Sequence, residues 1–263
     1  MIKLIITDLD GTLLSNEKHI PPDFDEVFDK LCEKGVKFAV ATGRNFAGVE
    51  KYFKDKVDKM HFICDNGAYL MEHDKLIQGV TINRELAHKV FKAVKSHGNI
   101  DVIACGKKGT YYTHCLPQTQ ELLKDFYTKT IFVDDMCDID DDFFKISIND
   151  FNNPLKTGSY QYIVDNFGDL LSINASGDIW MDTMAKDINK GVGVEALQKL
   201  LGITKEETMV FGDYYNDISM LDKAEFSFAM STAPDDVKAH SKYIADNCEN
   251  YGVTKAIKEY VLN

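Results

Sequence analysis

Near its start the chain has a short apolar run followed by an acidic turn, Leu4-Ile5-Ile6-Thr7-Asp8-Leu9-Asp10-Gly11-Thr12-Leu13-Leu14. An apolar run without alternation is typical of a strand that is buried on both faces of a parallel sheet. Residues i and i+2 of an extended chain lie on the same side, so Asp8 and Asp10 can face one site. Gly11 then allows the backbone to turn sharply and to approach a ligand closely. The stretch therefore predicts an acidic site at the end of a buried strand.

Apolar runs alternate with helical patterns at both ends of the chain, which is typical of parallel βαβ units. Further buried strands are predicted at 36–41, 62–64, 208–211 and 226–230. Two amphipathic helices are predicted from apolar residues at helical spacing, one from Phe24, Val27, Phe28 and Leu31, the other from Phe46, Val49 and Phe53. These patterns predict an α/β protein with a parallel sheet.

Between Asn83 and Ala185 the pattern changes, because hairpins replace crossover connections. Helices are predicted near 85–96, 118–127 and 157–167, and strands near 101–105, 110–114, 143–148, 170–175 and 178–183, with a turn at 176–177. We therefore expect an inserted α+β domain of residues 83–185, within a core made of residues 1–82 and 186–263.

The composition limits which kinds of partner the protein is expected to bind. The 263 residues include 30 Lys+Arg and 42 Asp+Glu, which gives a formal net charge of −12. Nucleic-acid binding needs a basic face that displaces counterions from phosphates, so no nucleic-acid partner is expected. The apolar residues that precede Asp8 are too few for a signal-peptide core or a membrane span. We therefore expect a cytoplasmic protein without a membrane partner.

Cysteines, histidines and one acidic segment offer weaker signals. The six cysteines lie far apart and are predicted to be buried free thiols. The seven histidines show no HxH or HExxH spacing, so a zinc site is not expected. The segment Asp134–Asp142 holds six aspartates in nine residues but lacks the glycine and glutamate of an EF-hand loop. It is interpreted as a solvated loop.

Two later strand ends also carry polar residues. Thr42-Gly43-Arg44 follows the second strand, and Gly212-Asp213-Tyr214-Tyr215-Asn216-Asp217 follows a late one. Because the carboxyl ends of parallel strands meet at one crevice, Asp8, Asp10, Asp213 and Asp217 are expected to lie close together.

Such a cluster needs positive charge. Each close pair of like charges costs about 4 kcal/mol at 4 Å and an effective dielectric constant of 20. All-oxygen ligands of this kind favour Mg²⁺, and Lys190 is a candidate for a further positive charge. The Thr42 hydroxyl and loop N–H groups suit a phosphate.

One competing motif is the stretch Gly191-Val192-Gly193-Val194-Glu195-Ala196, which has the Gly-x-Gly-x-x-Ala spacing of a dinucleotide-binding turn. That motif requires a strand that leads directly into the glycines. The preceding residues, Lys186-Asp187-Ile188-Asn189-Lys190, are polar. A dinucleotide site is therefore not favoured.

Taken together, the motifs Asp8-x-Asp10-Gly-Thr-Leu-Leu, Thr42-Gly-Arg, Lys190-Gly and Gly212-Asp213-x-x-Asn216-Asp217 resemble the four motifs of the haloacid dehalogenase superfamily. The chain is most similar to its Cof-type sugar-phosphatase-like members, and the resemblance extends to Asn66-Gly67-Ala68 and Tyr251-Gly252-Val253. It implies a Rossmann-like parallel-sheet core with a large inserted α/β cap domain.

The resemblance also implies a role for each motif residue. Asp8 corresponds to the nucleophile that forms an aspartyl-phosphate, and Asp10 to the general acid and base. The Mg²⁺ ligands would be Asp8, the main-chain carbonyl of Asp10, and Asp213, with Asp217 orienting them from outside. The implied phosphate-binding groups are the backbone of Leu9 and Gly43 and the side chains of Thr42, Lys190 and Asn216.

We therefore expect a Mg²⁺-dependent phosphatase that acts on a small phosphorylated metabolite, with sugar phosphates as one candidate class. A phosphotransferase or mutase would use the same aspartyl-phosphate but pass the phosphoryl group to a sugar hydroxyl rather than to water. A phospho-accepting receiver-type signalling module would hold the phosphoryl group without turnover, and the inserted domain weighs against it. Steady turnover of a phosphomonoester separates the enzymes from the receiver.

Overall fold

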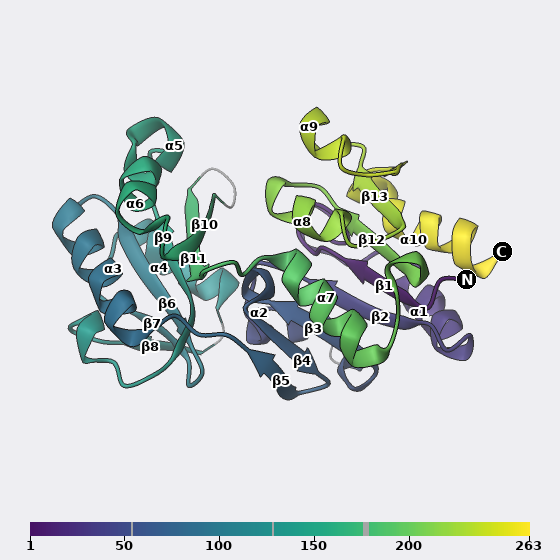
Figure 1. The fold of residues 1–263 in the computed structure, drawn as a ribbon, viewed down its shortest axis with the longest axis horizontal. Helices are drawn as coiled ribbons and strands as arrows, with labels where there is room; N and C mark the ends of the chain where they lie inside the picture. Colours follow the sequence, from purple (N-terminus) through teal and green to yellow (C-terminus); the bar gives the residue numbers. More distant parts are fainter. Residues whose placement is uncertain (54, 128, 176–178) are drawn as a thin grey trace. The chain divides into compact units, whose positions relative to one another are not determined.

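The computed structural model describes residues 1–53, 55–127, 129–175 and 179–263, and the chain forms two compact units (Figure 1). The first unit comprises Met1–Thr42, Tyr52–Gln78 and Asn189–Asn263, and the second comprises Gly43–Lys51 and Gly79–Ile188. The segment 43–51 thus groups with the second unit, which the sequence did not predict. The domain boundaries at 82/83 and 185/186 stay a proposal.

The first unit is built on an eight-stranded sheet. Its strand order is β14-β13-β12-β1-β2-β3-β4-β5, and the pairs from β14 to β3 are parallel, whereas β3 and β4 are antiparallel. The strands are β1 (Leu4–Thr7), β2 (Lys37–Ala41), β3 (Met60–Cys64), β4 (Tyr69–Glu72), β5 (Lys75–Gly79), β12 (Thr208–Gly212), β13 (Phe226–Met230) and β14 (Tyr243–Ala245).

Helices of the first unit cover both faces of this sheet. They are α1 (Phe24–Glu33), α7 (Lys190–Leu201), α8 (Ile218–Leu221), α9 (Asp235–Lys238) and α10 (Gly252–Ile257), with short helical turns η1 (Val57–Lys59), η2 (Asp65–Gly67), η4 (Lys205–Glu207), η5 (Tyr215–Asp217), η6 (Cys248–Asn250) and η7 (Lys258–Leu262). Ala39 belongs to the apolar cluster that contains Val194 of α7, whereas the ring of the adjacent Phe38 contacts Phe24 of α1. Because neighbouring strand residues point to opposite faces, α1 and α7 lie on opposite sides.

The second unit contains a six-stranded sheet with the order β10-β11-β9-β6-β7-β8, in which β7 and β8 are parallel and the other pairs antiparallel. Its strands are β6 (Asp101–Gly106), β7 (Thr110–Tyr112), β8 (Thr130–Phe132), β9 (Phe143–Asn149), β10 (Leu171–Ala175) and β11 (Trp180–Ala185), and its helices are α2 (Phe46–Glu50), α3 (Arg84–His97), α4 (Pro117–Phe126), α5 (Pro154–Thr157), α6 (Ser159–Phe167) and η3 (Met136–Asp138). Phe91 of α3 and Ile163 of α6 pack with Ile146 of β9 in one buried cluster.

The predicted fold class, a Rossmann-like parallel-sheet core with an inserted α+β cap, is confirmed, but several element predictions were wrong. The helix expected near 157–167 is present as α6 but begins only at Ser159, because Gly158, whose φ of 84° is left-handed, separates it from α5. The helix with Phe46 and Val49 ends at Glu50, before Phe53. The strands β4 and β5 were not predicted. The turn expected at 176–177 and the start of the strand expected at 178 lie outside the described residues.

The cysteine prediction holds only in part. All six cysteines are free thiols. Cys64, Cys105 and Cys248 are buried, and Cys115 and Cys137 are half-buried. Cys32 is exposed because the buried side of α1 is formed by Phe24, Val27, Phe28 and Leu31.

The acidic segment 134–142 is not solvated throughout. Asp141 is buried, and its Oδ2 accepts hydrogen bonds from Tyr111 Oη at 3.0 Å and from the Lys108 backbone N–H at 2.8 Å. Other aspartates of the segment form surface ion pairs, among them Arg84–Asp140 and Lys95–Asp135. The solvated-loop interpretation is therefore wrong at Asp141, because the segment packs against β7.

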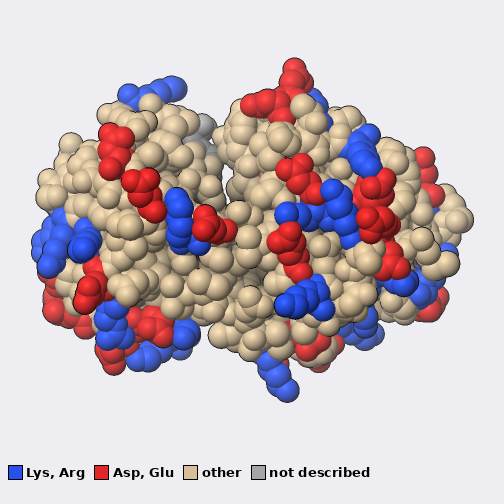
Figure 2. Space-filling view, viewed as in Figure 1, with Lys and Arg blue, Asp and Glu red and all other residues tan. Residues whose placement is uncertain are grey.

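On the face drawn in Figure 2, Lys and Arg side chains are interspersed with Asp and Glu side chains on both units. Among the helices of the described residues, none is both long and apolar enough to cross a membrane.

Candidate active site

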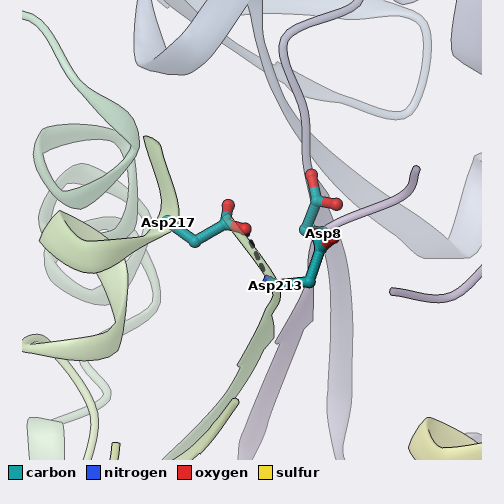
Figure 3. A group of neighbouring side chains, drawn as sticks. All are labelled: Asp8, Asp213 and Asp217. Carbon is teal, nitrogen blue, oxygen red and sulfur yellow. Dashed lines mark hydrogen bonds between the residues drawn. The ribbon is translucent and has the colours of Figure 1, made fainter. Parts of the chain in front are cut away.

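The site begins where the neighbouring strands β1 and β12 end side by side. Thr7 pairs with Phe211 in parallel register, and the backbone N–H of Asp8 donates to the Phe211 carbonyl at 2.9 Å. Asp8 and Asp213 follow these strand ends, and Asp217 lies on the turn after β12, as drawn in Figure 3. Hydrogen-bonded strand pairing thus brings residues about 200 positions apart into one place.

The turn after Asp8 brings its backbone close to Asp213. The N–H groups of Leu13 and Leu14 both donate to the Leu9 carbonyl, which closes the turn. Gly11 has a φ of 83°, and a Cβ at this position would lie 2.4 Å from Asp213 Oδ2. Only glycine fits here without displacing that carboxylate. The following Thr12 donates from Oγ1 to Asp213 Oδ1 at 3.0 Å.

The Asp10 side chain is more exposed than those of Asp8 and Asp217. Its side chain is 34% exposed and forms an ion pair with Lys18, whose Nζ lies 2.8 Å from Asp10 Oδ1. The Lys18 side chain is itself 43% exposed. A pair this accessible to water holds its geometry weakly, so the Asp10 carboxylate can change partner.

Lys190 joins two of the carboxylates. Its side chain is 1% exposed, and its Nζ donates to Oδ1 of Asp8 at 2.5 Å and to Oδ1 of Asp217 at 2.6 Å. Lys190 is the first residue of α7, and the preceding Asn189 caps this helix by accepting from Val192 N–H. The helix start therefore fixes the lysine between carboxylates from two other segments.

Both carboxylate oxygens of Asp217 are engaged. Oδ1 accepts from Lys190, while Oδ2 accepts from the backbone N–H groups of Asp213 (2.8 Å) and Tyr214 (3.0 Å). Figure 3 shows the first of these backbone contacts as a dashed line. Asp217 therefore holds the loop that carries Asp213.

The predicted phosphate-binding residues lie on four segments, which follow β1, β2 and β12 and begin α7. Thr42 is buried, its N–H donates to Ile63, and its carbonyl accepts from Asn66 N–H at 2.9 Å. Asn216 Nδ2 donates to Asn66 Oδ1 at 3.0 Å. Gly43 groups with the second unit, where its carbonyl accepts from Lys145 Nζ at 2.5 Å. Within the first unit, the structure thus links Thr42 to Asn216 through Asn66.

The pKa values of the buried groups reflect crowding of negative charge. Burial raises the pKa of Asp8 well above its usual value, and the carboxylates of Asp217 and Asp213 raise it further, while Lys190 acts in the opposite direction. Burial and the Asp217 carboxylate raise the pKa of Asp213 to about 7. For Lys190, burial acts to lower the pKa, but the carboxylates of Asp217 and Asp8 outweigh it and raise the pKa.

The donor set fits a divalent cation. Carboxylate oxygens of Asp8, Asp213 and Asp217 all lie within 4.8 Å of one another. The three carboxylates outnumber the ammonium group of Lys190, which binds Asp8 and Asp217, so negative charge remains when all three are ionised. Hard oxygen donors at this spacing suit Mg²⁺ better than a metal that prefers nitrogen or sulfur.

The glycines of the competing dinucleotide motif serve helix packing instead. A Cβ at Gly191 would lie 2.4 Å from the Ser219 carbonyl oxygen, and one at Gly193 would lie 2.3 Å from Ile63 Cγ2. Both glycines lie in α7, and β11, the strand before them, belongs to the other sheet. They allow α7 to approach its neighbours closely.

No role in the site was predicted from the sequence for Thr12, Lys18 or Asn66, and none for Lys145 in the second unit. The Asn66-Gly67 dipeptide was the available signal, since this pair favours left-handed turns. The contacts of Lys18 and Lys145 have no local sequence signature, because they depend on which residues folding brings near.

The chain is similar to known proteins over almost its whole length. A family model described as haloacid dehalogenase-like hydrolase matches residues 5–257. Over 97% of the chain and 95% of the relative, the sequence is 31% identical to the 5-amino-6-(5-phospho-D-ribitylamino)uracil phosphatase YbjI of Escherichia coli (strain K12).

Solved structures share the fold over the whole chain. The crystal structure of SMU.1108c from Streptococcus mutans UA159 has a TM-score of 0.92 and 26% identity, and covers 100% of both chains. The HAD subclass IIB sugar phosphatase BT4131 has a TM-score of 0.85 and 25% identity, and covers 99% of this chain and 100% of the other.

Proposed function

Because this chain belongs to the haloacid dehalogenase-like hydrolases and is a phosphatase, we propose that it hydrolyses phosphomonoesters of small metabolites through an aspartyl-phosphate on Asp8, with Mg²⁺. The observation that carries the proposal is the buried Asp8 carboxylate, which is held by Lys190 and lies within 4.8 Å of Asp213 and Asp217. A carboxylate fixed in this way is suited to nucleophilic attack on phosphorus.

In the first step, an oxygen of Asp8 attacks the substrate phosphorus, and the bond from phosphorus to the ester oxygen breaks. Lys190 binds Oδ1 of Asp8 and so limits rotation of this carboxylate. Asp10 donates a proton to the leaving alkoxide. It then takes a proton from the water that attacks the phosphorus of the aspartyl-phosphate, and the bond from phosphorus to the Asp8 oxygen breaks, which releases phosphate and restores the Asp8 carboxylate. The exposed ion pair with Lys18 leaves Asp10 able to turn toward the leaving group.

The remaining residues supply charge and hydrogen bonds. Asp8, the main-chain carbonyl of Asp10, and Asp213 would hold Mg²⁺, which when bound neutralises the oxygens of the transferring phosphoryl group. The Thr42 hydroxyl, Asn216, Lys190 and the backbone of Leu9 and Gly43 bind the phosphate oxygens. Positioning and electrostatic stabilisation are the main sources of catalysis in phosphoryl transfer.

For the substrate class we propose phosphorylated sugars or sugar alcohols. Two of the similar proteins carry names of this kind, one a phosphatase of a phosphoribitylamino-uracil and the other a sugar phosphatase. Transfer of the phosphoryl group to a sugar hydroxyl is the second candidate, since the same aspartyl-phosphate serves both reactions.

Phosphate release from a panel of phosphorylated sugars, sugar alcohols, nucleotides and cofactors tests the proposal, with Mg²⁺ or with EDTA. Asp8→Asn is expected to lower turnover by about 10⁴-fold or more. Asp235→Asn, at a fully exposed aspartate of the same unit, is the matched control.

The outcomes separate the candidate functions. Multiple turnover that EDTA and Asp8→Asn both abolish supports the proposal. Activity that survives in Asp8→Asn contradicts the assigned nucleophile. Release that rises on adding a sugar acceptor, with a new phosphorylated sugar formed, favours the transferase, and a stable phosphorylated Asp8 without release favours the receiver-type function.

A further inference from the structure

A turn with unusual backbone geometry lies at the end of β3. Asp65, Asn66 and Gly67 have φ values of 47°, 55° and 95°, so three consecutive residues have positive φ. Asp65 and Asn66 are both fully buried. Non-glycine residues keep this conformation only where surrounding contacts enforce it, and such turns are frequent at functional sites.

Asn66 connects two of the predicted phosphate-binding residues. Its backbone N–H donates to the Thr42 carbonyl at 2.9 Å, and its side-chain Oδ1 accepts from Asn216 Nδ2 at 3.0 Å. Thr42 follows β2, and Asn216 lies on the turn after β12, so these two contacts join segments from opposite sides of β1 in the sheet. All three residues belong to the first unit.

The neighbouring Gly67 brings the same turn against the start of α7. A Cβ at Gly67 would lie 2.1 Å from the carbonyl oxygen of Asn189, the residue before Lys190. The close approach therefore requires glycine at this position. One turn thus touches the three segments that carry Thr42, Lys190 and Asn216.

From this geometry we propose that Asn66 is a positioning residue that orients the Asn216 amide and the Thr42 peptide for binding a phosphate group. The inference rests on the proposed function, which assigns phosphate binding to Thr42 and Asn216. A primary amide has two N–H donors. Asn66 accepts one N–H of Asn216 and so fixes the amide plane, which leaves the second N–H for a phosphate oxygen.

Thr42 is held in a comparable way. Its N–H donates to the Ile63 carbonyl and its own carbonyl accepts from Asn66, so both sides of the residue are fixed to β3 and to the turn that follows it. Groups that are fixed before the ligand arrives lose less conformational freedom on binding. Asn66 acts through these groups and does not itself contact the phosphate.

A double-mutant cycle on phosphate affinity tests this role. Calorimetry with inorganic phosphate and Mg²⁺ is carried out on wild type, Asn66→Gly, Asn216→Ala and the double variant. Glycine retains the left-handed turn and removes only the side chain. Each single change is expected to weaken phosphate binding about tenfold, and the double variant should bind no more weakly than Asn216→Ala.

The proposal would be overturned if the losses of phosphate affinity are additive, which means about a hundredfold in the double variant. An unchanged phosphate affinity of Asn66→Gly would also overturn it. Asn153→Gly is the matched control, since Asn153 is another asparagine with positive φ (69°), which caps α5 in the second unit. Its phosphate affinity should equal that of wild type. Thermal unfolding of each variant reports whether the turn variants fold.

A measurement on the wild type applies even where Asn66→Gly does not fold. In ¹⁵N-labelled protein, the two Nδ2 protons of Asn216 are assigned by comparison with Asn216→Ala. Adding inorganic phosphate is expected to shift the proton that faces the ligand and to leave the proton bound to Asn66 nearly unchanged. Equal shifts of both protons, or of neither, would contradict the proposal.

These results separate the positioning role from the proposed function. Phosphate binding is measured without turnover, whereas the proposed function is tested by hydrolysis of the phosphomonoester panel by wild type. If the losses of phosphate affinity are non-additive but wild type hydrolyses no member of the panel, only the proposed function is overturned. If wild type hydrolyses the panel but the losses of phosphate affinity are additive, only the role of Asn66 is overturned.

Discussion

Replacing Lys190 by methionine is expected to destabilise the folded protein strongly, because it removes a positive charge from between two buried carboxylates. The Lys190 side chain is 1% exposed, and its Nζ lies 2.5 Å from Asp8 and 2.6 Å from Asp217. Removing one partner of a buried ion pair costs about 3–5 kcal/mol, since the remaining charge is left without compensation. The upper part of this range is expected for Lys190→Met, because two carboxylates lose the same partner.

The cost should depend on pH. Burial and neighbouring carboxylates raise the pKa of Asp8 and Asp213, the latter to about 7. A carboxyl group whose pKa is raised by folding binds its proton more tightly in the folded state, so stability increases as the pH falls from about 8 toward the usual carboxyl pKa near 4. Loss of Lys190 removes the charge that opposes these shifts. The penalty is therefore expected to be larger at pH 8 than at pH 5.

Urea unfolding of wild type and Lys190→Met at pH 8 and pH 5, in EDTA, measures both effects. Lys18→Met is the matched control, because Lys18 pairs with Asp10 in an exposed ion pair worth less than about 1 kcal/mol. A loss below about 1 kcal/mol for Lys190→Met at pH 8, or an equal loss at both pH values, would refute the reasoning.

Three further changes test other contacts. Lys145→Met should lower the free energy of unfolding, measured in urea, by about 3–5 kcal/mol, because Lys145 Nζ and Asp182 Oδ1 form a buried pair 3.8 Å apart. The double variant with Asp182→Asn should lose less stability than the two single variants added together, and strictly additive losses would disprove the coupling. Gly11→Ala should lower stability by about 1–3 kcal/mol, because the residue has a φ of 83° and a Cβ would lie 2.4 Å from Asp213 Oδ2. The same displacement of Asp213 should weaken the rise in Tm that Mg²⁺ causes, and an unchanged rise would contradict this prediction. Partial burial acts to raise the pKa of Asp23, but the hydrogen bonds from Lys258 and Thr254 and the charge of Lys258 together outweigh burial and lower the pKa. Asp23→Asn should therefore lower the free energy of unfolding by about 1 kcal/mol at pH 7, with the difference from wild type fading as the pH falls below about 4. A difference that stays constant with pH would be inconsistent with this pair.

Much of the fold and the candidate site follows from local sequence patterns. Apolar runs bounded by turns predict the buried strands β1, β2, β3 and β12, since a buried strand needs apolar residues on both faces. The motif residues Asp8 and Asp213 follow two of these strands, so the rule that parallel strands end at one edge brings them together. This inference required no knowledge of side-chain contacts.

Contacts across the chain could not be predicted in this way. The Lys190 ammonium binds Asp8 from 182 positions away, and its burial between two carboxylates depends on how α7 packs. The grouping of residues 43–51 with the second unit likewise depends on contacts such as that of Lys145 with Gly43. Local spacing contains no information on these partners.

The sequence by itself determined which segments form buried strands and which charged residues follow them, because periodicity and turn residues act over a few positions. Only the tertiary structure decided how those charges are arranged: Lys190 lies between Asp8 and Asp217, and Asn66 connects Thr42 to Asn216. The physical reason is that hydrogen bonds and ion pairs form between groups that the packed core holds within about 3 Å, whatever their separation along the chain.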